Sequence, residues 1–349
     1  MVRQEEDQRY GALTKWLDQC CPDEIQSIHP LVGDASFRRY FRVITNKGTF
    51  VAMDCPTERE NSKSFFAVNK AFETLGLHVP KIYEADLDQG FLFIEDFGDV
   101  LYLNAMTKHN ANQLYDKAMR DLTILQTCRQ ISDWQLLNFD YATFMVELSR
   151  FEEWYLVRYL GLVLTPNEKQ MLQATYDFLI SIAHAQPQVC VHRDYHSRNL
   201  MYLSDHDMGI LDFQDALLGP ITYDLMSLLR DSYIHWPQSQ IEEWVKRYYQ
   251  LCINKHMNLP DFKQFQYWFD LMSIQRHLKV LYIFSRLKLS YNNPNFIQYI
   301  PRVLAYLQRT LPYYPQLKEL KLFIERRVLP NESDVARRRT GEALREIDC

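Results

Sequence analysis

The sequence has little of what membrane, secreted or zinc-scaffold proteins require. No apolar run approaches the ~18 residues that a membrane-crossing helix needs. The first ten residues, MVRQEEDQRY, are charged, unlike the apolar core of a secretory signal. The seven cysteines are scattered without a C-x-x-C pair, which predicts reduced thiols rather than a disulfide or zinc framework. We therefore expect a cytoplasmic globular protein that does not bind a membrane.

An excess of positive charge is also missing. Asp and Glu number 44 against 39 Lys and Arg, which argues against a dedicated nucleic-acid-binding protein. With 47% hydrophobic residues, the 349 residues can form about two domains with a buried core. The charge is uneven, because residues 1–97 hold 11 basic and 16 acidic residues whereas residues 98–349 hold 28 of each. The composition leaves the oligomeric state open.

The first hundred residues carry most of the strand signal. Two aromatic or apolar runs flank Asn46-Lys47-Gly48, a pattern typical of a β-hairpin. A helix that Ser62 or Ser64 could cap and that Gly76 ends should follow. The strands and the helix expected in this part are 37–43, 50–53, 62–75, 81–85 and 91–94.

Long amphipathic segments dominate after Gly98, so the second part should be mostly helical. A small β-ribbon is expected to interrupt them at 189–212. The last stretch, 331–349, contains Arg337-Arg338-Arg339 and few apolar residues, which predicts a frayed end or a surface helix. The expected helices are 112–128, 141–160, 166–185, 238–254, 261–288 and 301–311.

The pattern with the clearest chemistry lies in residues 192–213, called here the motif segment. It contains His192-Arg193-Asp194, then Asn199 five residues after Asp194, and Asp212-Phe213. Phosphoryl transfer needs a carboxylate that orients or deprotonates the attacking hydroxyl, and oxygen ligands that hold Mg²⁺ against the phosphates. A polar turn between strands would explain Asp194 and Asn199, but it would not require Asp212.

The spacing matches the H-R-D-x-x-x-x-N loop and the start of the D-F-G of protein-kinase-like folds. With Gln214-Asp-Ala216, Gly219-Pro220 and Tyr223-Asp-Leu225, the chain resembles the aminoglycoside phosphotransferase branch of that superfamily. The resemblance implies an α+β, protein-kinase-like, two-lobed fold. Its N-terminal lobe, residues 1–97, would hold an antiparallel sheet with one helix, and its C-terminal lobe, residues 98–349, would be larger and mostly helical.

Within that branch the chain resembles the bacterial anomeric sugar kinases that act on N-acetylmuramate and N-acetylglucosamine. The resemblance implies ATP-dependent phosphorylation of the anomeric hydroxyl of an amino sugar, a small-molecule acceptor, in peptidoglycan recycling. A kinase of the same fold for an aminoglycoside, choline or homoserine stays open, as does a nucleotide-binding pseudokinase scaffold. The pieces behind this narrower resemblance are Gly33–Arg42, His78–Pro80, Glu153–Leu156, Ser227–Asp231 and Gln275–Lys279.

The resemblance also implies roles for single residues. Asp194 would be the catalytic base, and Asn199 and Asp212 would bind Mg²⁺. The stretch Ile94-Glu95-Asp96-Phe97 would be the hinge between the lobes, and its backbone would pair with the adenine of ATP. Glu95 and Phe97 are therefore nucleotide-binding candidates.

Two departures from the family pattern concern the phosphates. Protein kinases place a Lys in V-A-I-K on the third strand, but this chain has Val51-Ala52-Met53-Asp54. Asp54 must then point away from the phosphates, or the strand register must differ. The phosphate-covering loop has one glycine, in Gly33-Asp-Ala-Ser36, whose Ser36 and backbone amides could still cradle phosphate. Arg38 or Arg39 could supply the missing positive charge, although exposed strand arginines would show the same pattern.

The acceptor pocket is less clearly marked. Offsets of three, four and seven residues put Glu147, Arg150 and Trp154 on one helix face. Trp154 could stack on a sugar ring while the other two bond its polar groups, and Arg230 is a further candidate. A helix packed in the core would show the same spacing, and this structural role is the favoured alternative.

Overall fold

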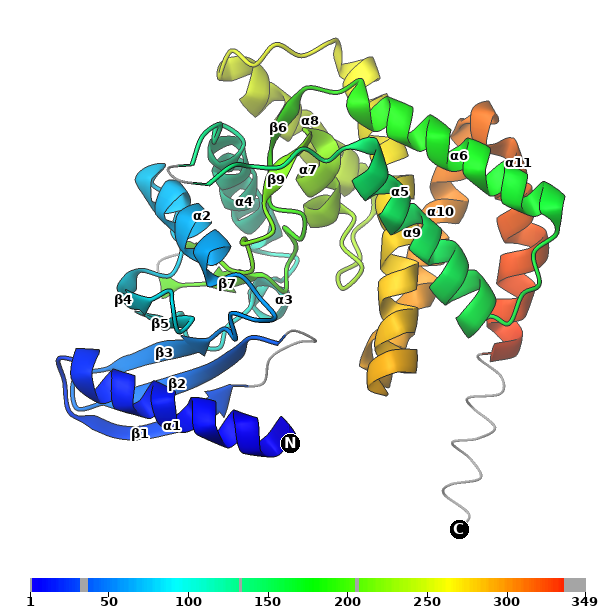
Figure 1. Cartoon of the computed structure of the whole chain (residues 1–349). Helices are drawn as coiled ribbons and strands as arrows, with labels where there is room; N and C mark the ends of the chain where they lie inside the picture. The colour runs from blue at the N-terminus through cyan, green and yellow to red at the C-terminus, as the bar shows by residue number, and fades with distance from the viewer. Residues whose placement is uncertain (1, 32–36, 132–133, 205–206, 336–349) are drawn as a thin grey trace. The chain divides into compact units, whose positions relative to one another are not determined.

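The computed structural model describes residues 2–31, 37–131, 134–204 and 207–335 (Figure 1). The chain divides into two compact units. The first unit is Met1–Leu137 with Cys190–Leu217, and the second is Asn138–Val189 with Leu218–Cys349. The first unit therefore combines the β-rich N-terminal part with the motif segment. The lobe boundary between residues 97 and 98 remains a prediction, and Arg337–Arg339 lie outside the described residues.

The first unit is built on a five-stranded antiparallel sheet in the order β1-β2-β3-β5-β4. Thr45 donates its N–H to the carbonyl oxygen of Gly48 at 2.9 Å, which closes the β2–β3 turn and confirms the predicted hairpin. The first strand of the sheet was not expected from the sequence. The strands are β1 (Ile25–Leu31), β2 (Arg39–Thr45), β3 (Thr49–Asp54), β4 (Ile82–Asp86) and β5 (Phe91–Glu95).

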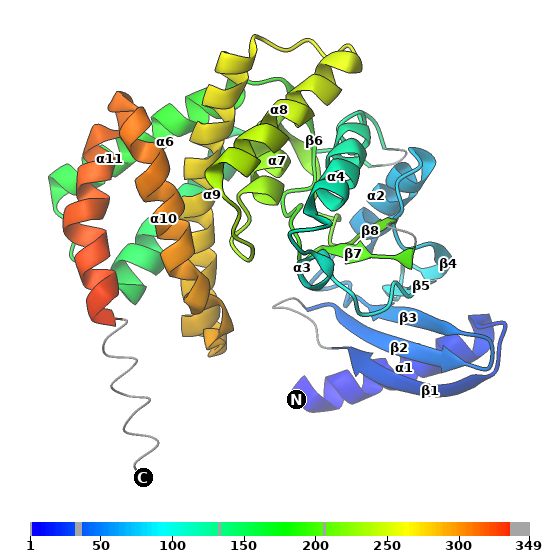
Figure 2. The ribbon, with the colours of Figure 1, turned by 180° about the vertical axis from the view of Figure 1, so that it is seen from behind.

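Four helices and a β-ribbon complete the described part of the first unit. The ribbon pairs β7 (Leu200–Tyr202) with β8 (Met208–Ile210), as predicted (Figure 2). The expected cap of α2 was wrong, because Asn61 rather than Ser62 or Ser64 accepts the first amide, that of Lys63, at 3.0 Å. The helices are α1 (Val2–Cys20), α2 (Ser62–Thr74), α3 (Tyr102–Ala105) and α4 (Ala111–Leu125).

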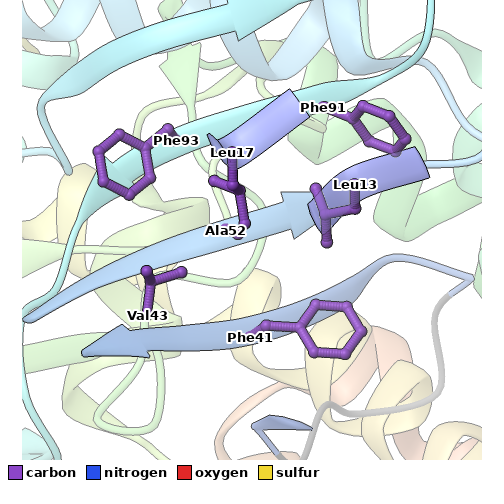
Figure 3. Packing of buried hydrophobic residues seen from close by; sticks show 7 residues of the cluster. All are labelled: Leu13, Leu17, Phe41, Val43, Ala52, Phe91 and Phe93. Carbon is purple, nitrogen blue, oxygen red and sulfur yellow. The ribbon is translucent and has the colours of Figure 1, made fainter. Parts of the chain in front are cut away.

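Helix α1, which the sequence analysis did not predict, covers one face of the sheet (Figure 3). Successive side chains of a strand point to opposite faces, so every second residue of β2 and β3 faces this helix. The residues of this core are Leu13 and Leu17 of α1 with Phe41, Val43, Ala52, Phe91 and Phe93 of the sheet.

Asp54 follows the same alternation and lies on the α1 face of β3, two residues after Ala52. Its carboxylate is fully buried and accepts hydrogen bonds from the Nε atoms of Arg9 and Arg39, both at 2.9 Å. The residue that stands where kinases carry a lysine therefore ties α1 to the sheet. Its side chain therefore points away from the opposite face of β3, which is the first of the two alternatives that the sequence left open.

The second unit is helical and centres on α9 (Phe262–Tyr291), which packs against α5, α6, α7, α8 and α10. Apolar residues occur all round α9, as expected of a buried helix. Although α9 has 30 residues, neither it nor any other described helix has an apolar stretch sufficient to cross a membrane. The other α-helices are α5 (Tyr141–Arg150), α6 (Pro166–His184), α7 (Thr222–Leu229), α8 (Gln238–Asn254), α10 (Ile300–Thr310) and α11 (Lys318–Phe323).

The long helix predicted over 141–160 is not one α-helix. It ends as α5 at Arg150 and continues as the π-helix η1 (Phe151–Tyr159). A π-helix bonds residue i to i+5, so side chains beyond Arg150 turn onto other faces than an α-helix would give them. Short elements complete the described part of the unit. The strand β9 (Leu217–Pro220) begins with the last residue of the first unit. The 3₁₀-helices are η3 (Pro294–Tyr299), η4 (Leu311–Tyr313) and η5 (Pro315–Leu317), and a second π-helix is η6 (Ile324–Val328).

We predict that Asp54→Ala destabilises the protein by about 3 kcal/mol, because two arginines lose their shared, buried partner. Urea unfolding followed by circular dichroism measures this change. Asp88→Ala, in an exposed loop, is the matched control and should change the free energy of unfolding by less than about 0.5 kcal/mol. Equal effects of the two substitutions would contradict the role given to Asp54.

Candidate active site

The motif segment follows β6 (Gln188–Val191) and is anchored by His192. The imidazole is fully buried, and the backbone N–H of Asp194 donates to its Nδ1 at 3.3 Å. Since Nδ1 accepts, Nε2 carries the proton and donates to the carbonyl oxygen of Leu211 at 2.8 Å. His192 thus fixes the loop with Asp194 to the residue that precedes Asp212.

Asn199 connects the same two stretches through its side chain. Its Nδ2 donates to the backbone carbonyl of Asp194 at 3.0 Å and to Oδ2 of Asp212 at 3.3 Å. Both bonds use the amide nitrogen and leave Oδ1 unused by them. The structure therefore brings Asn199 and Asp212 side by side next to Asp194, as the motif spacing predicts.

The surroundings of the Asp212 carboxylate disfavour its negative charge. Desolvation raises its pKa, and the negative charge of Asp194 raises it further, although a hydrogen bond from Gln214 at 2.8 Å opposes the shift. Its side chain is still 47% exposed, so one side of the carboxylate can reach a ligand. A cation between these oxygens would relieve the repulsion.

The donor set fits Mg²⁺ in particular. Asn199 and Asp212 offer hard oxygen atoms, and Mg²⁺ is bound by one or two protein carboxylates together with waters and phosphate oxygens. Within the described residues, no three His, Cys, Asp or Glu side chains group into a metal cluster of their own. Asn199 and Asp212 alone would fill only part of the coordination shell of Mg²⁺, which leaves positions for water or phosphate oxygens.

Two residues of the motif segment have a left-handed backbone. Arg193 has φ 78° and Asp212 has φ 62°, values that residues with a side chain seldom adopt. Each such conformation costs about 1–3 kcal/mol and persists where the surroundings fix it. The strain lies beside Asp194 and at Asp212, the two carboxylates to which the sequence assigns chemistry.

A cavity of about 630 Å³ opens onto Asp212 within the first unit. It is bordered by β2, β3, the stretch after β5, and the motif segment. Five of the six residues predicted to bind metal or nucleotide line it, and the sixth, Ser36, lies outside the described residues with the rest of Gly33–Ser36. Asp194 is not among the lining residues. The predicted residues that line the cavity are Arg38, Glu95, Phe97, Asn199 and Asp212.

The stretch after β5 is braced on both sides. Arg42 donates to Asp96 at 2.7 Å and to Asp99 at 2.9 Å, and these bonds raise the pKa of Arg42 above its usual range. The ring of Phe97 packs edge-on against His78 with 5.0 Å between ring centres. The predicted hinge is therefore a fixed wall of the cavity.

The four acceptor-binding candidates all lie in the second unit. Glu147 is buried in α5 and is bound by Lys279 Nζ at 3.0 Å and Gln275 Nε2 at 3.2 Å. Arg230 follows α7 and donates to Ser273 Oγ at 2.6 Å and to Asp270 Oδ1 at 2.5 Å. Both side chains therefore have protein partners, and their role toward an acceptor remains a prediction.

Arg150 and Trp154 lie on either side of the change from α-helix to π-helix. The offsets that placed Glu147, Arg150 and Trp154 on one face assume a single α-helix, and that assumption fails after Arg150. The roles of these residues toward an acceptor stay predictions. The Arg158 guanidinium lies 4.2 Å from the centre of the Trp154 ring. An acceptor stacked on this face of Trp154 would have to displace it.

The sequence analysis missed two residues that contact the candidate site. Gln214 stands where D-F-G carries glycine and donates to Asp212. Glu60, just before α2, pairs with Arg38 at 3.3 Å. Gln214 could have been noticed from the altered motif. Glu60 gave no local signal, because its contact joins the start of β2 to a loop 22 residues later.

Phe97 also rests directly on the β-ribbon. A Cβ added to Gly209 of β8 would come within 2.5 Å of the Phe97 ring. We predict that Gly209→Ala destabilises the protein by about 1–3 kcal/mol, because the added methyl overpacks this contact. Gly11→Ala is the control, since nothing lies within 4 Å of its added Cβ and alanine suits helix α1. Urea unfolding measures the change. A Gly209→Ala variant as stable as Gly11→Ala would show that the close contact between Gly209 and the Phe97 ring is not needed for stability.

Comparison with known proteins supports phosphoryl transfer, the reaction that the motif segment predicts. The chain matches the model of the phosphotransferase enzyme family over residues 27–256. The N-acetylmuramate/N-acetylglucosamine kinase of Pseudomonas putida is 38% identical over 329 residues, covering 90% of this chain and 96% of its own. The protein of that name from Neisseria meningitidis serogroup B is 38% identical over 321 residues, covering 90% and 94%.

Solved structures show the fold. The choline kinase LicA from Streptococcus pneumoniae superposes with a TM-score of 0.58 at 14% identity, covering 85% of this chain and 98% of its own. The ADP-bound aminoglycoside phosphotransferase APH(2'')-Ib gives 0.56 at 14% identity, covering 85% and 96%. The fold class and the family resemblance predicted from the sequence are thus confirmed. The chain belongs to the phosphotransferase enzyme family and has its protein-kinase-like fold.

Proposed function

We propose that this protein transfers the γ-phosphoryl group of ATP to the anomeric hydroxyl of an amino sugar, N-acetylmuramate or N-acetylglucosamine. The observation that carries the proposal is the match to relatives of that name over nearly their whole length, at 36–38% identity. The product would be a sugar 1-phosphate, ready for nucleotidyl transfer in peptidoglycan recycling. The reaction would take place in the cytoplasm and would involve neither nucleic acid nor a membrane.

The motif segment supplies the chemistry in this proposal. The carboxylate of Asp194 accepts the proton of the attacking hydroxyl, and its loop is kept in place by His192. Asn199 and Asp212 would hold Mg²⁺ through their side-chain oxygens. When bound, the metal supplies positive charge against the phosphate oxygens, so catalysis rests on positioning and electrostatics.

The nucleotide would occupy the 630 Å³ cavity. The backbone around Glu95 and Phe97 would pair with adenine, since this stretch forms one wall of the cavity. Arg38 and Ser36 are proposed to contact the phosphates. Glu147, Arg150, Trp154 and Arg230 remain proposals for the acceptor, and the lobes 1–97 and 98–349 remain the proposed division of labour between nucleotide and acceptor.

Other acceptors are the main alternative. The solved choline kinase and aminoglycoside phosphotransferase share this fold, but at 14% identity the fold does not select a substrate. The neutral charge balance of residues 98–349 fits a neutral or singly anionic sugar better than a polycation. A pseudokinase scaffold would have no need of Asp194, Asn199 and Asp212 together.

We expect Asp194→Asn to lower kcat by about 10²–10⁴-fold, because an amide cannot accept the proton of the hydroxyl. The KM for ATP should change little, since Asp194 acts on the acceptor. Release of ADP with N-acetylglucosamine measures both constants. Asp18→Asn, exposed on α1, should match wild type. Turnover of Asp194→Asn within a few-fold of wild type would exclude Asp194 as the base.

The position of the new phosphate tests the acceptor. We expect ³¹P and ¹³C NMR of the product of N-acetylmuramate or N-acetylglucosamine to place phosphate on C1. With choline, homoserine or an aminoglycoside as the acceptor, the enzyme should release ADP no faster than it does without any acceptor. Phosphate on C6 would refute the anomeric assignment. Turnover of choline, homoserine or an aminoglycoside faster than that of the amino sugars would refute an amino sugar as the acceptor.

A further inference from the structure

The cavity must provide positive charge for a triphosphate without the usual strand lysine. On β3, Ala52 and Asp54 face α1, so the residues between them face the other way. These are Val51, which lines the cavity, and the buried Met53. The cavity face of β3 therefore offers hydrophobic side chains and no cation.

Positive charge does lie on the cavity side of β2 and at Arg38, the residue just before this strand. Arg39, Phe41 and Val43 face α1, whereas Arg38, Tyr40 and Arg42 line the cavity. The two arginines differ in their partners. Arg42 binds Asp96 and Asp99 of the hinge stretch, while Arg38 reaches the carboxylate proposed to bind the metal.

Arg38 lies between two carboxylates. Its Nε pairs with Glu60 Oε2 at 3.3 Å and its Nη2 lies 3.7 Å from Asp212 Oδ1. The side chain is 10% exposed. Since the arginine guanidinium stays protonated in proteins, a positive charge is held beside the carboxylate proposed to bind the metal.

Glu60 fixes this arrangement through both oxygens. Oε1 accepts the backbone N–H of Phe37 at 3.2 Å, and Oε2 binds the neighbouring Arg38. The next residue, Asn61, caps α2. Glu60 therefore joins the start of β2 to the start of α2 and limits how far the guanidinium can move.

We propose that Arg38 binds the nucleotide phosphates in place of the strand lysine, and that Glu60 is the positioning residue that aims Arg38 at them. The proposal rests on the proposed function in one respect, which is that a nucleoside triphosphate binds in the cavity. With Mg²⁺ held by Asp212, the planar guanidinium of Arg38 would be available to phosphate oxygens, which a guanidinium can bind through two parallel hydrogen bonds.

Nucleotide binding tests this without an acceptor sugar. Calorimetry with Mg²⁺ and the non-hydrolysable analogue AMP-PNP gives the Kd of each variant. Arg38→Met should weaken binding at least about tenfold, the loss of one or two charge-assisted hydrogen bonds. Arg38→Lys should recover part of this loss. Arg59→Met is the matched control, because Arg59 is exposed and stacks on Phe37, 5.1 Å from its ring centre.

The pair Glu60 and Glu58 separates positioning from general charge. Glu60→Gln should weaken AMP-PNP binding about three- to tenfold by loosening Arg38, whereas the exposed Glu58→Gln should not change it. Because Glu60 acts through Arg38, adding Glu60→Gln to Arg38→Met should have no further effect.

Three results would overturn the proposal: Arg38→Met binding like Arg59→Met, Glu60→Gln binding like Glu58→Gln, or additive losses in the double variant. Thermal melting checks that each variant is folded, and if Arg38→Met is not, Arg38→Lys and Glu60→Gln decide the matter. A wild-type protein that binds AMP-PNP but does not phosphorylate an amino sugar would refute the proposed acceptor and leave this test intact.

Discussion

The electrostatic position of the Asp212 carboxylate is the constraint on which the motif segment depends. Desolvation raises the pKa of Asp212, and the charge of Asp194 adds to that shift, so both favour protonation of the carboxylate. The surrounding groups oppose it: Gln214 donates to Asp212, Asn199 bridges to it, and a guanidinium lies nearby. The hydrogen bonds of His192 keep the two stretches from separating. The result is a negatively charged site whose oxygen atoms fit a divalent cation.

The alternation of side chains along β2 and the residue before it, Arg38, places the arginines on two different faces. Arg39 turns toward α1 and neutralises the buried Asp54, whereas Arg38 and Arg42 turn toward the cavity. Neighbouring residues at the start of this strand therefore provide both the ion pair that fastens α1 and, in our proposal, the charge that would replace a strand lysine. The cavity face of β3 is hydrophobic, with Val51 beside the predicted hinge.

Local sequence patterns predicted the features whose signal is local. The β2–β3 hairpin, the β7–β8 ribbon, the long helices and the Asp194–Asn199–Asp212 grouping all follow from spacing within short stretches. Features that depend on distant partners did not emerge. Glu60 meets Arg38 only after the chain has folded, and the α-to-π change at Arg150 leaves no mark in the apolar periodicity. Helix α1 was missed because its first residues are strongly charged.

The ion pair between Glu147 of α5 and Lys279 of α9 is almost fully enclosed, with side chains 3% and 5% exposed. A dehydrated charge without its counterion costs several kcal/mol. Sliding α5 along α9 by one helical turn would strand both charges at once, whereas apolar neighbours would tolerate such a shift. The pair therefore fixes the register of the two helices against each other. Substitutions at positions 147 and 279 should be tolerated chiefly when they occur together.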